Sequence, residues 1–346
     1  MLVSIVITNF NYADFLADAI ESALNQSYQP IEVIVVDDGS TDGSRAIIES
    51  YEGQLHPIFK ENAGQLSSVN LGFSRSRGDA IIFLDSDDVL YGDAVERHVG
   101  NLSLSGVVKS QGYLEVADRC LKPSGAVIPL MQLSESGDYK KRFFKYGPSA
   151  YRATFTSGHA WSRAFLEAVM PLPEEQAGLV GPDGYLTAID ALFGRIESVE
   201  GPLGKYRIHG GNAGPQGYRC TNEYFKARVQ GYLHRINFAA AKARKMGYQV
   251  DPDVWLRHTG WKLMLARHIL YRNGELPDRV PFWRIVLSPL REANANFLMG
   301  LLRSLMLAAV RLAPSEIGLR LGHRMLDKSW GRALVPVSIP TERIQD

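Results

Sequence analysis

Three aspartates stand close together in the segment FLDSDD, at Asp85, Asp87 and Asp88. They come directly after the apolar run DAIIFL at residues 79–84, which is typical of a buried strand. Neighbouring carboxylates repel one another and raise one another's pKa unless a cation lies among them. A divalent cation, Mn²⁺ or Mg²⁺, would relieve that repulsion and could then bind phosphate oxygens. The alternative is an aspartate-rich turn that caps the next helix.

Two other polar clusters also stand where apolar runs end. ITNFNY follows the run that begins at Leu2, and VVDDGS ends the run at residues 31–36. Helical spacing follows each cluster, and Asn11 is the expected N-cap of the first helix. Apolar strands that alternate with amphipathic helices predict a parallel sheet covered on both faces. Ligands of such sheets bind at the carboxyl ends of the strands, so we expect the three clusters to converge.

Past Gly106 the pattern is looser, and from Gly217 it becomes almost wholly helical. Residues 107–116 indicate a strand, TFTSGHAWSRAFLEAV a strand, a glycine turn and a helix, and GPDGYLTAIDALFG a single helix. LGKYRIHGGN indicates a last strand that runs into a loop. The sequence therefore predicts an α/β domain at residues 1–215 and a helical region at residues 216–346.

Composition places the chain among ordinary globular proteins. Of its 346 residues, 45% are hydrophobic and 22% are charged. Residues 1–216 hold 17 Lys and Arg against 27 Asp and Glu, whereas residues 217–346 hold 21 against 10. The acidic part could host cations, and the basic part could face phosphates, anionic lipid or nucleic acid. Nucleic acid is the least favoured of these partners, because no motif that reads it is present.

The cysteines and the N-terminus bear on the compartment. Cys120 and Cys220 stand far apart without metal-type spacing, and the first residues lack the basic region of a signal peptide. These features argue against a disulfide framework and favour a reducing compartment. We therefore expect a cytoplasmic protein.

The ordered motifs together resemble those of glycosyltransferase family 2. The segments that carry the resemblance lie within residues 2–214 and are VSIVITNFNYADFLADAIESALNQSY, IEVIVVDDGSTDGS, ENAGQLSSVNLGFSRSRGDAIIFLDSDD, TSG, GPDGYL and YRIHGGN. Members of this family have the glycosyltransferase-A fold, a Rossmann-like domain that binds a nucleotide sugar. The resemblance implies such a domain here, with a mostly parallel central sheet, followed by the helical C-terminal region.

For the nucleotide, the resemblance implies that Thr8 and Phe10 line the base pocket, with Asn11 beside them. The Phe10 ring would stack on a pyrimidine, and Asp38 would accept a hydrogen bond from the ring N–H. Asp85 would hold the ribose. From the residues alone, Phe10 could equally be a core residue and Asp38 a turn former.

For the metal and the donor, the resemblance implies that Asp87, Asp88 and His209 bind Mn²⁺ or Mg²⁺, and an imidazole ligand favours Mn²⁺. Side chains alternate along an extended segment, so Asp88 should point away from Asp87, and we favour Asp87 as the metal contact. Gly158, in TSG, corresponds to the loop that passes close to the donor. A plain turn is the competing interpretation of that glycine.

For the chemistry, Asp183 matches the aspartate of the family's Glu-Asp pair, the general base of inverting transfer. Pro182 stands where the family has the glutamate, and Asp183 could instead be a helix N-cap. Asp190 lies seven residues further along the expected helix and is the alternative base.

The segment ANFLMGLLRSLMLAAVRLA, residues 295–313, is strongly apolar. Asn296, Arg303, Ser304 and Arg311 fall on one stripe of the expected helix, and two arginines are costly inside a membrane. The helix could lie on anionic lipid at the inner face of the plasma membrane. It could equally pack on its neighbours or within a homo-oligomer, and the sequence leaves these alternatives open.

The resulting hypothesis is an inverting, metal-dependent hexosyltransferase that uses a nucleotide sugar, with a uridine-linked donor favoured. Its acceptor would be a glycan or a lipid-linked glycan in polysaccharide biosynthesis. A sugar nucleotidyltransferase shares the Rossmann-like layout but needs a Gly- and Arg-rich phosphate loop, which ITNFNYADF lacks. A non-catalytic assembly protein that binds nucleotide sugars is the third alternative, and Pro182 is the residue that hints at it.

Overall fold

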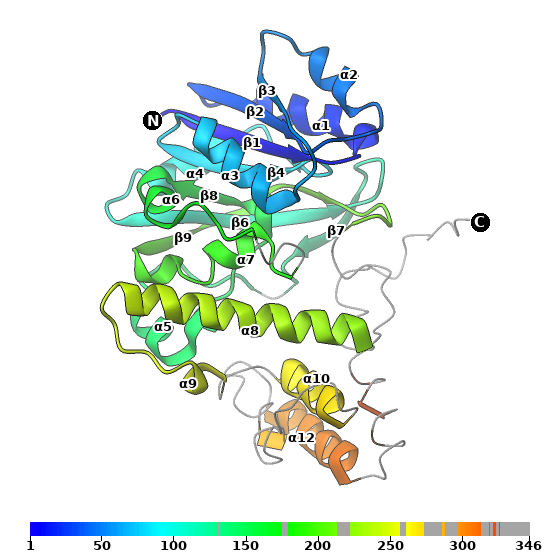
Figure 1. Ribbon diagram of the computed structural model, residues 1–346, viewed down its shortest axis with the longest axis vertical. Helices are drawn as coiled ribbons and strands as arrows, with labels where there is room; N and C mark the ends of the chain where they lie inside the picture. The colour runs from blue at the N-terminus through cyan, green and yellow to red at the C-terminus, as the bar shows by residue number, and fades with distance from the viewer. Residues whose placement is uncertain are drawn as a thin grey trace, which may run out of the picture. The chain divides into compact units, whose positions relative to one another are not determined.

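The computed structural model describes residues 1–130, 132–174, 179–212, 222–256, 261–272, 286–287, 297–312, 318, 321–322 and 325 (Figure 1). The chain divides into two compact units. The first holds residues 1–144 and 150–209, and the second holds residues 145–149 and 210–346. The division thus falls at residue 209, whereas the sequence led us to expect it after residue 215. Cys220 lies outside the described residues.

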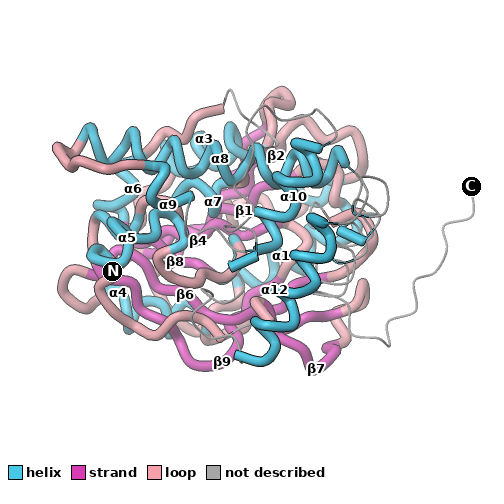
Figure 2. Tube along the Cα trace, turned by 90° about the horizontal axis from the view of Figure 1, so that it is seen from below, coloured by secondary structure: helices cyan, strands magenta, loops and turns pink. Residues whose placement is uncertain are grey.

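The first unit is an α/β fold built on one mixed sheet, in the order β3-β2-β1-β4-β8-β6-β9-β5, with β7 paired to β6. In Figure 2, β1, β4, β8, β6 and β9 follow one another across the unit. The strands are β1 (Val3–Asn9), β2 (Ile31–Asp37), β3 (His56–Phe59), β4 (Ala80–Asp85), β5 (Val89–Leu90), β6 (Val107–Ala117), β7 (Pro123–Ile128), β8 (His159–Ser162) and β9 (Arg195–Arg207). The helices and turns of this unit are α1 (Ala13–Leu24), α2 (Ser44–Glu49), α3 (Gln65–Arg75), α4 (Ala94–Leu102), η2 (Thr156–Gly158), α6 (Arg163–Val169), α7 (Pro182–Leu186) and η3 (Asp190–Leu192). Helix α5 (Lys140–Tyr146) begins in the first unit and ends in the second, which also holds η1 (Gly147–Ser149).

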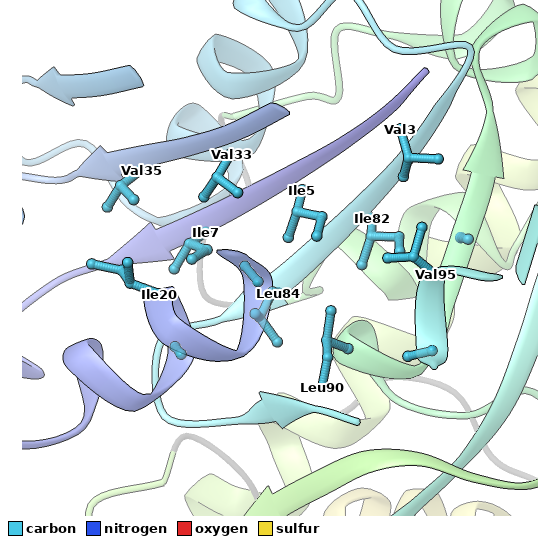
Figure 3. Packing of buried hydrophobic residues seen from close by; sticks show 14 of the residues in the cluster. Val3, Ile5, Ile7, Ile20, Val33, Val35, Ile82, Leu84, Leu90 and Val95 are labelled. Atoms are coloured by element: carbon cyan, nitrogen blue, oxygen red, sulfur yellow. The ribbon is translucent and has the colours of Figure 1, made fainter. Parts of the chain in front are cut away.

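Strands β1 to β4 form the parallel part of the sheet. Strands β1, β2 and β4 are buried on both faces, as the continuous apolar runs predicted, whereas β3 lies at the edge and is partly exposed. Alternate residues such as Ile5, Ile82 and Leu84 point to one face, where they pack with α1 and α4 in one cluster. Figure 3 shows these side chains between the strands and α1, with Leu90 and Val95 closing the cluster. Helix α3 covers the opposite face, where a Cβ on Gly72 would stand 2.3 Å from a Val6 methyl.

The expected fold class is confirmed, but some local predictions were wrong. Helix α1 has Tyr12 rather than Asn11 as its N-cap, and the Tyr12 side chain makes no capping hydrogen bond. The Ala13 N–H donates to Asp42 Oδ2 at 2.9 Å. Asn11 instead adopts a left-handed backbone with φ 58°, and its Oδ1 accepts from the Thr41 N–H at 2.8 Å. The cap is therefore supplied by a residue distant in sequence.

The single helix expected over GPDGYLTAIDALFG is two short pieces, α7 and η3, so Asp183 and Asp190 do not share one helix. Strand β5 was missed because two residues carry no periodicity, and β7 because it is a partly exposed hairpin partner of β6. Sequence patterns work best where burial is continuous, and these segments lack it.

The second unit is helical in the described residues, as expected. Its helices include α8 (Asn222–Lys245), α9 (Pro252–Leu256), α10 (Trp261–Arg272) and α12 (Phe297–Leu312). Helices α8, α10 and α12 share one apolar cluster, which includes Phe225, Ile269 and Leu307. Among the described residues, no helix combines the length and the apolar character needed to cross a bilayer.

The described residues of the expected polar stripe on α12 do not form its exposed face. Ser304 is buried, whereas Leu302, Leu305 and Met306 are each more than half exposed. Asn296 and the Arg311 side chain lie outside the described part of the chain. The hydrophobic pattern alone could not show which side of this nearly apolar helix its neighbours would cover.

Ile5 tests the packing of the sheet, because its side chain is fully buried in the middle of β1. We expect Ile5→Ala to lower the free energy of unfolding by about 2–5 kcal/mol, since it removes buried methylene groups and leaves a cavity. Urea unfolding would measure this change. Leu104→Ala is the control, because Leu104 is 53% exposed and should change stability by at most about 0.5 kcal/mol.

Candidate active site

The parallel strands bring the three polar clusters to one edge of the sheet. Asn9 pairs with Asp37 across β1 and β2, and Thr8 pairs with Asp85 across β1 and β4. The Asn9 side-chain amide donates to Asp37 Oδ1 at 2.7 Å, and the Asp38 N–H donates to the Asn9 carbonyl at 2.8 Å. The ends of β1, β2 and β4 therefore form one continuous polar rim, as the sequence predicted.

The proposed nucleotide residues lie along this rim. Phe10 is 44% exposed, and Thr8 is partly buried beside Asp85. Asp38 is buried and already accepts hydrogen bonds from the N–H groups of Ala63 (3.0 Å) and Gly64 (2.7 Å) and from the Lys60 ammonium. Asp38 therefore holds the loop that leads into α3, in addition to any contact it could make with a base.

The three aspartates after β4 stand in a turn and not in an extended segment. The Asp88 N–H donates to the Asp85 carbonyl at 3.1 Å, which reverses the chain direction. The alternation used to orient these side chains therefore does not apply. Asp85 accepts a hydrogen bond from the Gln65 side chain at 2.7 Å, and the Asp88 side chain is buried.

Asp88 is held by two distant segments. Its Oδ2 accepts from Ser157 Oγ at 2.6 Å, and its Oδ1 accepts from the Arg207 N–H at 3.1 Å. Ser157 Oγ also accepts from the Asp85 N–H at 3.2 Å. These contacts join the turn after β4 to η2 and to the end of β9.

Burial and mutual repulsion disfavour ionisation in this turn. Burial, with the negative charges of Asp87 and Asp183, raises the pKa of Asp85 to about 8. Burial, with the charges of Asp87 and Asp85, raises the pKa of Asp88 well above its usual value. The turn thus concentrates more carboxylates than it can keep ionised without a compensating positive charge.

Asp87 faces His209, with 3.0 Å between Asp87 Oδ2 and His209 Nε2, and both side chains are largely buried. The His209 ring packs against Phe15 at 4.4 Å and meets Tyr12 edge-on at 5.3 Å between ring centroids. The structure therefore brings together two of the three expected metal ligands from residues distant in sequence.

Arg207 fixes the backbone of this pair. Its guanidinium is buried and donates to the carbonyls of Asp87 (2.8 Å) and Arg119 (2.7 Å) and to Asp18 Oδ2 (2.7 Å). One side chain thus joins α1, the turn after β4 and the turn after β6. Because Arg207 stands two residues before His209, the same strand end positions both.

The donor set fits a divalent cation in its chemistry, since carboxylate oxygens and one imidazole nitrogen converge where negative charge is uncompensated. Within the described residues, no three His, Cys, Asp or Glu side chains are arranged as a complete metal site. Asp87 and His209 would therefore be the protein ligands, and phosphate oxygens of a bound nucleotide could complete the coordination.

The candidate base lies within electrostatic reach of this turn, because the charge of Asp183 contributes to the raised pKa of Asp85. Asp183 stands in the first turn of α7, and its carbonyl accepts from the Thr187 N–H (2.9 Å) and Oγ1 (2.6 Å). Asp190, the alternative base, is buried and bound to Lys109 at 3.2 Å. Asp190 is thus engaged in the core.

Gly158 has a packing role in this structure. A Cβ at this position would lie 2.8 Å from the Gly112 carbonyl oxygen and 2.8 Å from a Thr154 methyl. Real Cβ atoms do not approach backbone that closely, so η2 can lie against β6 only with glycine here. The close approach of a donor, which the sequence suggested, is a separate expectation.

Sequence reasoning missed the residues that hold the aspartates, namely Gln65, Ser157 and Arg207. Each lies inside or next to a segment that carried the family resemblance: Gln65 in ENAGQ, Ser157 in TSG and Arg207 in YRIH. These residues could have been predicted by considering the polar residues next to each motif in addition to the motif residues themselves.

Comparison with known proteins places this site in a family. Residues 4–113 match the family described as Glycosyl transferase family 2. An uncharacterized glycosyltransferase of Nostoc sp. is 31% identical over 284 residues, which cover 76% of this chain and 85% of that relative. A Bacillus subtilis relative, named as a candidate teichuronic acid biosynthesis glycosyltransferase, is 37% identical over 102 residues, 28% of this chain and 40% of that relative.

Solved structures agree on the fold. The crystal structure of residues 1–349 of S. aureus TarS matches with a TM-score of 0.55 and 17% identity, over 95% of this chain and 91% of that chain. The same TarS segment in complex with UDP-GlcNAc matches with a TM-score of 0.54 and 14% identity, over the same shares. At this identity the likeness shows the glycosyltransferase-A type of fold. The family match over residues 4–113 and the 31% identity to the Nostoc relative along 76% of this chain show that the chain belongs to glycosyltransferase family 2.

Proposed function

We propose that the protein is an inverting, metal-dependent hexosyltransferase that moves a sugar from a uridine-linked donor to a glycan or lipid-linked acceptor. The observation that carries this proposal is the grouping of Asp85, Asp87, His209 and Asp183 at one end of the sheet. Polysaccharide biosynthesis is supported by the name of the B. subtilis relative. We propose the cytoplasm as the location of the protein, as expected from the sequence.

The donor would lie along the rim formed by β1, β2 and β4. Phe10 offers an exposed aromatic face for the base, and Thr8 and Asp85 stand side by side in register for the ribose. The side chains of Asn11 and Asp38 accept hydrogen bonds from the N–H groups of Thr41 and Gly64 and so hold the neighbouring loops in place. The uridine assignment is supported by TarS, which has been crystallised with UDP and with UDP-GlcNAc.

Mn²⁺ or Mg²⁺ would be held by Asp87 and His209, with Asp88 behind them. When bound, such an ion offsets the charge of the diphosphate leaving group. Asp87 and His209 are kept in contact by Arg207 and by the rings around the imidazole. Gly158 lets η2 pack close, so that Ser157 can hold Asp88 in place.

Asp183 would accept the proton of the acceptor hydroxyl while the acceptor oxygen attacks the anomeric carbon. Attack opposite to the departing diphosphate inverts the configuration at that carbon. Pro182 occupies the first position of α7 and fixes the start of this helix. Proline has no backbone N–H, and none is needed there because the first N–H groups of a helix have no partner within it. The replacement of the family's glutamate is therefore compatible with a rigid position for Asp183.

Two alternatives from the sequence lose support. A sugar nucleotidyltransferase would release pyrophosphate from a nucleoside triphosphate and a sugar phosphate, and family 2 membership does not favour that reaction. A non-catalytic protein would bind nucleotide sugars without turning them over. Slow metal-dependent hydrolysis of a nucleotide sugar by the purified protein would eliminate the non-catalytic alternative.

Asp87 tests the metal role. We expect nucleotide diphosphate sugars to raise the melting temperature more with Mn²⁺ than without it, because binding to the native state stabilises it. Asp87→Asn should lose this Mn²⁺-dependent increase and also lose turnover, while its melting temperature without ligand stays close to that of the wild type. Thermal-shift assays with UDP-, GDP- and dTDP-sugars would measure both effects. Asp93→Asn, an exposed control in the following turn, should behave as the wild type. Unchanged turnover in Asp87→Asn would refute the metal role.

Asp183 tests the base. Asp183→Asn keeps the shape of the side chain but removes its ability to take a proton, so kcat should fall by roughly 10²–10⁴-fold. Calorimetric titration with the nucleotide sugar should give a dissociation constant within about twofold of the wild type, because Asp183 is proposed to contact the acceptor. An equal loss of donor binding and turnover would reduce Asp183 to a structural residue at the start of α7.

We also propose that α12 attaches the protein to an anionic membrane surface. Its exposed side chains Leu302, Leu305, Met306 and Leu312 follow helical spacing on one face and are 51–77% exposed. A helix with such a face inserts at the lipid interface, and basic residues add attraction to anionic headgroups. The excess of Lys and Arg over residues 217–346 supplies that charge.

Leu305 tests this attachment. Leu305→Glu should abolish co-sedimentation with phosphatidylglycerol vesicles, because it places a negative charge in the middle of the apolar face. Leu104→Glu is the matched control, since Leu104 is similarly exposed but lies in the first unit. Binding of the wild type should weaken with salt and with neutral phosphatidylcholine. A concentration-dependent dimer that Leu305→Glu disrupts, without vesicle binding, would contradict the membrane proposal and favour a second copy.

A further inference from the structure

Lys109 is a charged residue in the middle of the sheet. It lies on β6, where it pairs with Trp161 of β8 and with Ile196 of β9, and its side chain has no exposed surface. Removing an ammonium group from water is costly unless the charge is paired and hydrogen-bonded. A lysine at this position therefore calls for a specific partner.

That partner is a closed triangle of polar groups. The Lys109 Nζ lies 3.2 Å from Asp190 Oδ2 and donates to the Tyr151 hydroxyl at 2.6 Å. The Tyr151 hydroxyl in turn donates to Asp190 Oδ2. The ammonium also lies 4.5 Å from the Tyr151 ring centroid and 5.2 Å from that of Trp161. Three segments, β6, the loop before η2 and η3, thus meet at one buried charge pair.

The contribution of this triangle to the free energy of unfolding does not by itself explain why it is present. Well-packed apolar side chains of similar volume often stabilise a core as much as a buried ion pair does, because the pair must be desolvated. What an ion pair adds is direction, since its atoms must meet in one geometry. The arrangement therefore favours a positioning role for the segment that carries Asp190.

The same segment carries Asp183. From Asp183 to Asp190 the chain is a run of linked turns, in which the N–H groups of Thr187, Ala188 and Ile189 donate to carbonyls three or four residues earlier. The side chains of Leu186, Ala188 and Ile189 are fully buried. A piece of chain bonded in this way moves as a unit, so the position of Asp190 sets the position of Asp183.

Lys109 also acts on Asp183 through space. Burial lowers the pKa of Lys109 to about 8, and this lowering is opposed by the charge and hydrogen bond of Asp190 and, more weakly, by the negative charge of Asp183. Asp183 likewise repels Asp85. The charge of Asp183 thus interacts with both the Asp85 carboxylate, which repels it, and the Lys109 ammonium, which attracts it.

We propose that Lys109, Asp190 and Tyr151 form a positioning unit that anchors the α7–η3 segment and directs Asp183 toward the acceptor. None of the three is a catalytic residue, because they act through the chain and the charge of Asp183. The inference rests on the proposed role of Asp183 as base and names the residues that hold it in place.

The test uses the full-length chain and the double variant Lys109→Met with Asp190→Asn. Lys109→Met alone leaves a buried carboxylate without its cation and should have the lowest melting temperature. The double variant removes both charges together and should recover most of that loss. Its kcat should nevertheless stay roughly 10²-fold below the wild type with the donor dissociation constant unchanged, because a small displacement of the base is enough.

Hydrogen exchange supplies a readout that needs no substrate. In the double variant we expect faster exchange at the amides of residues 183–192, measured by mass spectrometry on the protein alone. The control is the pair Arg77 and Glu32, which lie 3.1 Å apart at the opposite end of the strands. Arg77→Met with Glu32→Gln should leave the exchange of residues 183–192 and kcat unchanged.

The outcomes separate the two proposals. Wild-type exchange at residues 183–192 in the double variant, or full recovery of kcat along with stability, overturns the positioning unit. Faster exchange with no transfer by the wild type on any nucleotide sugar supports the anchor and counts against the proposed activity instead. Donor binding that falls in parallel with kcat would also overturn the inference, because the anchor would then serve the whole site.

Discussion

Repulsion among the carboxylates at the end of β4 is the constraint to which the rest of the site responds. Asp85, Asp87 and Asp88 share one tight turn, and burial adds to the difficulty of keeping them ionised. Four residues from three places donate to these carboxylates: Gln65 from α3, Ser157 from η2, and Arg207 and His209 from the end of β9. The Gln65 amide, the Ser157 hydroxyl and the Arg207 backbone N–H are neutral donors, so a bound cation would supply positive charge that they do not.

The two parts of the sheet divide the work. The parallel strands β1 to β4 place polar residues along one rim, and this follows from the general behaviour of parallel sheets. Strands β8, β6 and β9 are paired differently, and their function is to bring η2, α7 and His209 back to that rim. The half proposed to bind the donor meets the rest of the sheet at β8, and β8 pairs in turn with β6, where Lys109 is buried.

The sequence allowed the first half to be predicted closely, because β1, β2 and β4 are buried on both faces and the helices between them have clear apolar faces. The convergence of ITNFNY, VVDDGS and FLDSDD followed from that pattern alone. The contacts of Arg207 and Ser157 could not be predicted, because hydrogen bonds across 70 or more positions leave no periodic trace. The break between α7 and η3 was not predicted for a related reason. The ion pair between Asp190 and Lys109, which are distant in sequence, outweighed the local preference for one continuous helix.

The position of β8 beside β4 has a consequence for the synthesis of the chain. β4 ends at Asp85, whereas its pairing partner β8 begins only at His159. One edge of β4 therefore stays unpaired while the intervening chain emerges from the ribosome. At about 5–20 residues per second this interval is on the order of 4–15 s. An unpaired apolar strand is a template for wrong pairing, so the nascent protein passes through a period in which shielding by a chaperone would raise its yield.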